Sequence, residues 1–192
     1  MSLDQQIKNI NRKSYFQLTK IKQIKKYLTD DLNKSLVHSL IFSNLDYCNI
    51  LYYNMPSYKL NKLQKIQNSA ARVLTNTSKY SHITPVLKSL HWLPVKSRIE
   101  FKILVFTYNC LNSNTTSSIN TLIAQCHPAR PLRSSNKNML VEQKERYSSG
   151  SRLFQFASPY LWNKLPEDIK SSETLSIFKK RLKTHLFSKS FN

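Results

Sequence analysis

Glycine is nearly absent from this chain of 192 residues, which has one copy, Gly150. An average usage near 7% would place about thirteen glycines in a chain of this length. The glycine-dependent turns that bind dinucleotides, cradle phosphates or present a nucleophilic serine need several glycines at fixed spacing. The sequence therefore excludes all three, and a chain with so few flexible positions favours helices.

Cysteines and long apolar runs are also scarce. The three cysteines, Cys48, Cys110 and Cys126, are odd in number and widely spaced, so they form neither a disulfide framework nor a C-x-x-C zinc motif. This usage favours a reducing intracellular compartment, nuclear or cytoplasmic. No apolar run exceeds four residues and the N-terminus has no apolar segment, so we expect neither a signal peptide nor a membrane span.

Acidic residues are few compared with basic ones. Thirty Lys and Arg stand against ten Asp and Glu, which gives a formal net charge of +20. The surplus is spread along the chain: 9 basic and 4 acidic residues in 1–60, 8 and 1 in 61–112, and 13 and 5 in 113–192. Such a field attracts polyanions, so nucleic acid is the first expected partner and an anionic membrane surface a weaker one.

Apolar residues make up 40% of the chain, including ten Tyr, nine Phe and two Trp, which is enough for a folded core. Their three- and four-residue spacing predicts a mainly α-helical bundle. Trp92 and Trp162 are interpreted as core side chains. We also expect a small β-hairpin, with strands over 138–143 and 152–156 joined around Gly150. The predicted helices cover 14–28, 29–45, 60–74, 95–111 and 173–187.

The residue composition and the apolar pattern divide the chain into three segments. Residues 1–56 read as a helical pair and residues 57–112 as a helical core segment. Residues 113–192 form a C-terminal segment with the expected hairpin and a terminal basic helix. The run of Asn, Ser and Thr over 112–118 is the best candidate for a linker between the second and third segments.

The sequence offers little for catalysis. Asp30 and Asp31 follow Tyr27, but the spacing does not fit the aromatic-x-Asp-Asp box of polymerases. Thr29 is instead a helix N-cap with both aspartates in the first turn. The adjacent Cys126 and His127 side chains point apart in an extended segment. We therefore expect no catalytic residue, metal site or cofactor here.

Basic clusters are the stronger signal. They fit either a solvated surface or contact with phosphates. Arginines interleaved with Tyr147 and Phe154 suit single strands, by stacking and phosphate pairing. The nucleic-acid-binding candidates are Lys62, Lys65, Arg72, Arg130, Arg133, Arg146, Arg152, Lys179, Lys180, Arg181 and Lys183.

Several long motifs resemble one family. From about residue 12 to the end, the chain is similar to the region after the polymerase palm in LINE-type (non-LTR) retrotransposon reverse transcriptases of the jockey-like group. The motifs that carry this resemblance are Val37–Leu40, Leu45–Asn49, Leu60–Leu74, His82–Val95, Arg98–Lys102 with Tyr108, Arg130–Ser135, Ala157–Pro166 and Phe178–Lys183.

The resemblance implies the tail of a longer RNA-directed DNA polymerase, with thumb-like helices in 1–56. No residue here matches the family's catalytic motifs, which lie upstream of this region. The implied function is a non-catalytic fragment that grips the template–primer backbone, with RNA, DNA or RNA–DNA duplex and the upstream palm as partners. The alternative is a helical protein-interaction module, or a relic of the element with no retained nucleic-acid role.

Overall fold

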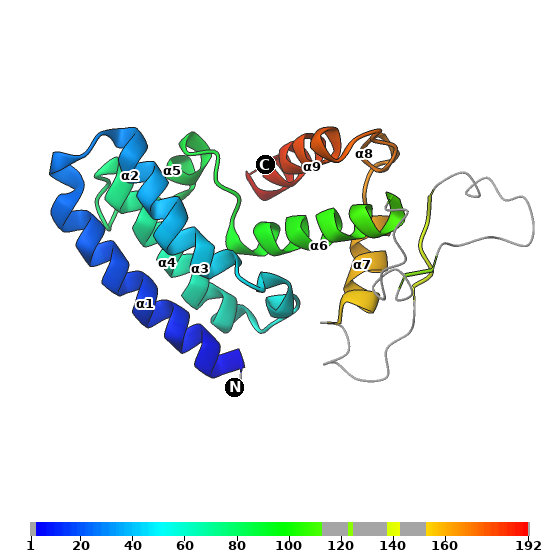
Figure 1. Ribbon diagram of the computed structural model, residues 1–192, viewed down its shortest axis with the longest axis horizontal. Coiled ribbons are helices and arrows are strands. Elements are labelled where there is room, and N and C mark those ends of the chain that lie inside the picture. The colour runs from blue at the N-terminus through cyan, green and yellow to red at the C-terminus, as the bar shows by residue number, and fades with distance from the viewer. Residues whose placement is uncertain (1–2, 113–122, 125–137, 143–152, 192) are drawn as a thin grey trace, which may run out of the picture. The chain divides into compact units, whose positions relative to one another are not determined.

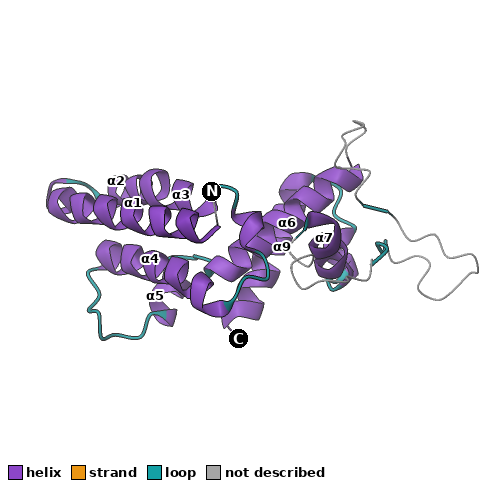
Figure 2. Cartoon of the chain, turned by 90° about the horizontal axis from the view of Figure 1, so that it is seen from below, coloured by secondary structure: helices purple, strands orange, loops and turns teal. Residues whose placement is uncertain are grey.

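The computed structural model describes residues 3–112, 123–124, 138–142 and 153–191, and most of these are helical, as the sequence predicts (Figures 1 and 2). Among these residues, no helix combines the length and the apolar character needed to cross a bilayer. The helices are α1 (Leu3–Ile24), α2 (Asp30–Val37), α3 (Ser43–Asp46), α4 (Ser57–Thr75), α5 (Thr84–Ser89), α6 (Val95–Asn112), α7 (Phe154–Asn163), α8 (Glu167–Lys170) and α9 (Leu175–Phe191).

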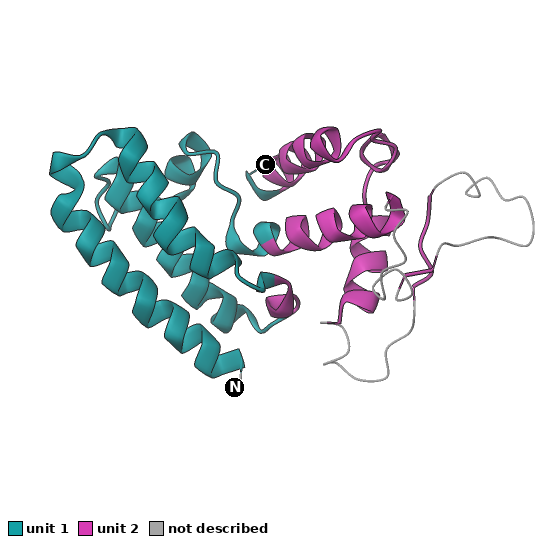
Figure 3. Cartoon of the chain, in the orientation of Figure 1, with its two compact units in different colours: residues 1–49, 55–98, 190–192 teal, residues 50–54, 99–189 magenta. Residues whose placement is uncertain are grey.

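The chain forms two compact units, coloured separately in Figure 3. Unit 1 comprises residues 1–49, 55–98 and 190–192 and contains α1 to α5. Unit 2 comprises residues 50–54 and 99–189 and contains most of α6, α7, α8 and most of α9.

Helix α1 begins at Leu3, well before the predicted start at residue 14. Its buried face includes the polar Ser14, which interrupts the apolar stripe and weakens the pattern by which a helix is recognised. Within the predicted range 14–28, the apolar spacing also includes Tyr15 and Ile24, but each of these side chains is 44% exposed. The buried side chains are Ile7, Ile10, Ser14, Leu18 and Ile21.

The predicted helix cap at Thr29 is confirmed. The hydroxyl of Thr29 accepts a hydrogen bond of 3.4 Å from the Leu32 amide, and Asp30 and Asp31 occupy the first turn of α2. Carboxylates there interact favourably with the positive end of the helix dipole. A π-helical turn, His38–Phe42, continues α2 into α3.

Two glutamines of α4 hold the segment that leads into α6. Gln67 is fully buried, and its Nε2 donates to the Leu93 carbonyl at 2.8 Å. The Oε1 of Gln64 accepts from the Val95 amide at 2.8 Å, which satisfies an N–H at the start of α6. The side-chain amides of α4 therefore determine where α6 begins.

Helices α1 and α4 run in the same direction, as contacts between their N-terminal ends and between their C-terminal ends show. Near their N-termini, the Lys59 ammonium lies 2.5 Å from a carboxylate oxygen of Asp4. Near their C-termini, the Lys25 ammonium donates to the carbonyls of Val73 at 2.6 Å and Leu74 at 2.8 Å.

Lys25 closes the C-terminal end of α4. Besides the two carbonyls, its ammonium donates to Oδ1 of Asn76 at 2.7 Å. Asn76 has the left-handed conformation, φ 54°, that commonly ends a helix. A cation here satisfies carbonyls that have no partner within the helix and opposes the negative end of its dipole.

We expect Lys25→Met to lower the free energy of unfolding by about 1–2 kcal/mol, because it removes charge-assisted hydrogen bonds to helix-end carbonyls. Urea denaturation of the whole chain measures the change. Lys26→Met is the matched control, since the Lys26 ammonium lies 4.8 Å from the Tyr27 ring centroid in an exposed position. Equal losses in the two variants would contradict the capping role.

An aromatic cluster forms part of the unit 1 core. Trp92, 6% exposed, packs edge-on against Phe42 with ring centroids 4.6 Å apart. The Arg98 guanidinium lies 4.4 Å from the Phe42 centroid. It also pairs with Asp46 through two hydrogen bonds, one of them 3.0 Å from Nε to Oδ1. The predicted core role of Trp92 is confirmed.

The core of unit 2 is built around Phe178 of α9. Its ring stacks on Tyr108 of α6 at 4.3 Å between centroids, and Trp162 of α7 lies 5.9 Å away. Trp162 is 2% exposed, which confirms its predicted core role. The Tyr108 hydroxyl donates to the Ser172 carbonyl at 2.7 Å, so this buried ring keeps a polar partner.

The predicted β-hairpin is not supported. Phe154, inside the second expected strand, begins α7, because the residues that follow it bury one helical face containing Ala157, Leu161 and Trp162. Within 138–142 only Leu140 forms a β-bridge, and this segment pairs elsewhere: the Val141 amide donates to the Ala124 carbonyl at 2.9 Å. Helix packing thus decides the conformation of 154–156, while the expected turn around Gly150 lies outside the described residues.

Candidate nucleic-acid interface

Helix α4 presents two of the predicted basic residues to solvent and uses the third in the fold. Lys62 and Lys65 are exposed, and the sequence of α4 contains no Asp or Glu. Arg72 is half-buried and donates to the carbonyls of Ser78 at 3.2 Å and Ser81 at 3.0 Å. Lys62 and Lys65 are therefore available to phosphates, whereas Arg72 holds the loop after α4.

Helix α1 adds cations beside those of α4. Its one acidic residue, Asp4, accepts a hydrogen bond from Lys59, and this bond lowers the pKa of the carboxyl group. The charges of Lys62 and Lys8 lower the pKa further, so three lysines surround this carboxylate. The same contact raises the pKa of Lys59. The N-terminal ends of α1 and α4 thus form a strongly basic region of unit 1.

Arg12 and Lys13 are basic residues of α1 that were not among the sequence candidates. Both side chains are exposed, and neither has a hydrogen-bond or ion-pair partner within the described part of the chain. The sequence signal that could have found them is the helical spacing of Leu3, Ile7 and Ile10, which extends α1 across 3–13.

A basic hollow of about 670 Å³ lies at the C-terminal ends of α1 and α4. Two of its cations, Lys25 and Arg72, already donate to backbone carbonyls. Asp30 also lines it and reduces its net charge. The basic residues that line the hollow are Lys22, Lys25, Lys26, Arg72 and Lys79.

Two exposed tyrosines lie next in sequence to that hollow's lysines. Tyr27 is 76% exposed and Tyr80 is 86% exposed. In each case the ammonium of the preceding lysine, Lys26 or Lys79, lies 4.8 Å from the ring centroid. Such exposed lysine–tyrosine pairs contribute little to stability, about 0.5–1 kcal/mol each.

In unit 2, α9 carries the predicted C-terminal cluster. Lys179, Lys180, Arg181 and Lys183 are all exposed, and the helix contains no acidic residue. Arg181 donates from Nη1 to the Asp168 carbonyl at 2.6 Å. The three lysines are therefore the side chains of this cluster with the most freedom to contact phosphates.

A hollow of about 960 Å³ beside this cluster is lined by Lys180, Arg181, Thr184 and His185, among others. Burial lowers the pKa of His185, and the neighbouring Lys189 charge lowers it further. The imidazole is therefore neutral at pH 7 and adds no charge to the basic surface.

Four predicted site residues, Arg130, Arg133, Arg146 and Arg152, lie outside the described residues. Their expected role beside Tyr147 and Phe154 stays a prediction.

The described residues hold no group of three or more His, Cys, Asp or Glu side chains placed to bind a metal ion. Asp31 pairs with Lys34 at 3.4 Å on the surface of α2. Burial raises the pKa of Cys110, which keeps its thiol protonated at neutral pH. The groups suited to binding among the described residues are instead free cations and exposed aromatic rings.

No family model, curated protein or solved structure matches this chain.

Proposed function

We propose that this chain is a non-catalytic, nucleic-acid-binding C-terminal part of a LINE-type retrotransposon reverse transcriptase. In this role its helices hold the sugar–phosphate backbone of an RNA–DNA template–primer, and a polymerase palm encoded upstream is its protein partner.

The observation that carries the proposal is the excess of free cations on three long helices. Helix α1 carries five basic residues and one acid, and α4 and α9 carry basic residues without any acid. At about 1.5 Å per residue, the cations from Lys8 to Lys22 extend along roughly 20 Å of α1. That length is more than half a turn of a duplex, whose pitch is about 34 Å. A line of charge on this scale suits a polyanion better than a small anion.

Phosphate contact also explains why these charges are left unpaired. Uncompensated lysines repel one another and destabilise the compact state. Binding to phosphates releases condensed counterions, which offsets that repulsion in the complex. Such contacts are independent of base sequence, as a protein that travels along any template requires.

The proposal is tested with the double variant Lys62→Gln/Lys65→Gln in the whole chain. We expect affinity for an RNA–DNA duplex to fall about tenfold, and the slope of log affinity against log salt to become shallower by about 1.8, because two phosphate contacts are lost. Fluorescence anisotropy over a range of salt concentrations measures both. Arg72 is left unchanged, since its removal would also free the loop it holds.

Lys34→Gln is the control, because Lys34 is exposed but pairs with Asp31. It should leave the slope unchanged. An unchanged slope in the double variant would show that α4 does not contact phosphates. A wild-type chain that binds no nucleic acid at low salt would contradict the proposal as a whole and favour the alternative, a helical protein-interaction module.

A further inference from the structure

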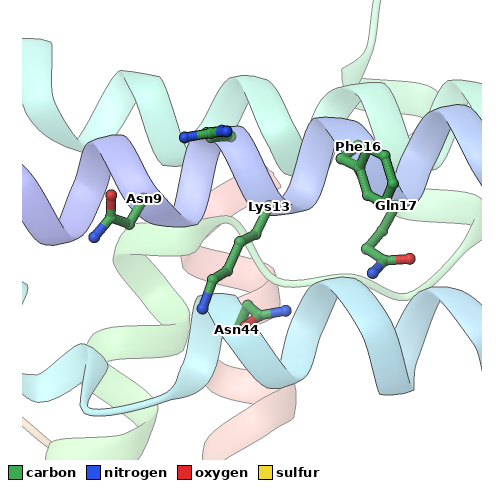
Figure 4. Close-up of a pocket in the computed structure, with 6 residues that line it drawn as sticks. Asn9, Lys13, Phe16, Gln17 and Asn44 are labelled. Carbon is green, nitrogen blue, oxygen red and sulfur yellow. The ribbon is translucent and has the colours of Figure 1, made fainter.

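One groove of unit 1 differs from the other basic surfaces in the chemistry of its lining. It has a volume of about 730 Å³ and runs between α1 and α3. Figure 4 shows Lys13 and Gln17 extending from α1 toward the side where Asn44 lies on α3. The residues that line it are Asn9, Arg12, Lys13, Phe16, Gln17 and Asn44.

The charge of this groove is uncompensated. Arg12 and Lys13 are adjacent exposed cations, and the lining contains no Asp or Glu. In the basic hollow at the other end of α1, by contrast, two cations are used by backbone carbonyls and a carboxylate is present. The groove is therefore the better place for a phosphate, which an arginine binds through paired N–H donors.

An aromatic ring faces solvent in the same groove. Phe16 is 60% exposed, and the Lys20 ammonium lies 5.5 Å from its ring centroid. A phenyl ring has no polar group to gain from water, so covering it is favourable. A nucleobase stacked on the ring would cover it, and stacking of this kind tolerates any base.

The remaining lining residues are side-chain amides with unused hydrogen-bonding groups. Asn44 donates through Nδ2 to the Leu40 carbonyl at 2.7 Å, which leaves its Oδ1 as an acceptor. Asn9 accepts through Oδ1 from Gln5 at 3.4 Å, which leaves its Nδ2 as a donor. The side chain of Gln17 is half-buried and has no hydrogen-bond partner within the described residues. Amides of this kind hydrogen-bond to the edges of unstacked bases.

We propose that this groove binds an unpaired nucleotide of a single-stranded RNA or DNA segment. The base stacks on Phe16, the phosphate lies against Arg12 and Lys13, and the amides of Asn44 and Gln17 contact the base edge. This inference rests on the proposed nucleic-acid role and adds to it a preference for a single-stranded segment at this site, because a paired base cannot reach the ring.

The test compares three labelled probes on the whole chain: oligo(A) RNA and oligo(dA) of about 12 nucleotides, within the usual site size for single strands, and a blunt RNA–DNA duplex of the same length. Phe16→Leu should weaken binding of the single strands about 5- to 100-fold, because a stacking partner is lost. Its affinity for the duplex should change less than about twofold. The RNA and DNA arms show which sugar the groove accepts.

Phe106→Leu is the matched control. Phe106 is another exposed phenyl ring, 41% exposed, on α6 in unit 2, and it does not line the groove. It should leave affinity for all three probes unchanged. Because Phe16 is exposed, its substitution should not unfold the chain, and an unchanged urea midpoint verifies this.

The double variant Arg12→Gln/Lys13→Gln tests the phosphate contact separately. We expect the salt slope for single strands to become shallower by about 1.4, from two lost contacts. Polyglutamate serves as a competitor without bases. If it displaces the oligonucleotides equally well from wild type and from Phe16→Leu, the groove binds anions in general and the assignment of a nucleotide site is wrong.

These measurements distinguish failure of the groove assignment from failure of the proposed nucleic-acid role. If Phe16→Leu and Phe106→Leu bind single strands equally well while binding remains salt-dependent, the groove assignment is wrong and the proposed function stands. If wild type binds none of the probes at low salt, both are wrong.

Discussion

Affinity of the whole chain for an RNA–DNA duplex is expected to fall about 500-fold when salt is raised from about 50 to 200 mM. About five neutralised phosphates give a slope of log affinity against log salt of about −4 to −5, and this slope produces the loss. Five free cations are exposed on α4 and α9: Lys62, Lys65, Lys179, Lys180 and Lys183. Anisotropy titrations at several salt concentrations measure the slope directly.

The salt experiment separates backbone contact from other kinds of binding. Recognition through apolar surfaces would give affinity that is nearly independent of salt, because no counterions are released. Binding at low salt with a slope near zero would therefore contradict the proposed grip on the backbone. Duplexes of different base sequence should give the same slope, since phosphate contacts carry no base information.

The stability of unit 2 depends on the buried ring of Phe178. We expect Phe178→Ala to lower the free energy of unfolding of this unit by about 3–5 kcal/mol. Phe178 is fully buried, and its removal leaves a cavity against Tyr108 and Trp162. Most domains are stable by only about 5–15 kcal/mol, so this variant should populate the unfolded form at moderate urea concentrations.

The fluorescence of Trp162 in a Trp92→Phe background reports on unit 2 alone, since Trp92 belongs to unit 1. Ile177→Ala is the matched control on the same helix, because Ile177 is 38% exposed. It should cost less than about 1 kcal/mol. Similar urea midpoints for the two variants would mean that Phe178 is not part of a close-packed core.

Several of the motif residues that carry the family resemblance pack in the cores of the two units. Gln67 holds the segment before α6, and Trp92 packs in the core of unit 1. Tyr108, Trp162 and Phe178 form the centre of unit 2. These motifs therefore describe how the two units are built. The same motifs also contain free cations: Lys62, Lys65, Lys179, Lys180 and Lys183 occupy exposed positions of α4 and α9.

Periodicity predicted the helices well where apolar residues form the whole buried stripe. In α9, within the predicted range 173–187, the buried side chains are Phe178, Leu182 and Leu186, which follow the helical period. The prediction failed where a polar residue is buried, as at Ser14, because a hydrogen-bonding side chain in the stripe hides the period. It also failed at 154–156, part of the second expected strand, where the adjacent helical face decides the conformation.

Composition and spacing alone determined the helical class, the basic surface and the exclusion of glycine-dependent sites, because these follow from residue counts and local period. Which cations remain free was decided only by tertiary structure. In the sequence, Arg72 and Lys25 look like surface charges. In the structure, Lys25 donates to the carbonyl of Val73 at the end of α4, and Arg72 donates to the carbonyl of Ser78 in the loop after α4. The groove at Phe16 was likewise out of reach of sequence, because Asn44 comes to α1 only when α3 folds beside it.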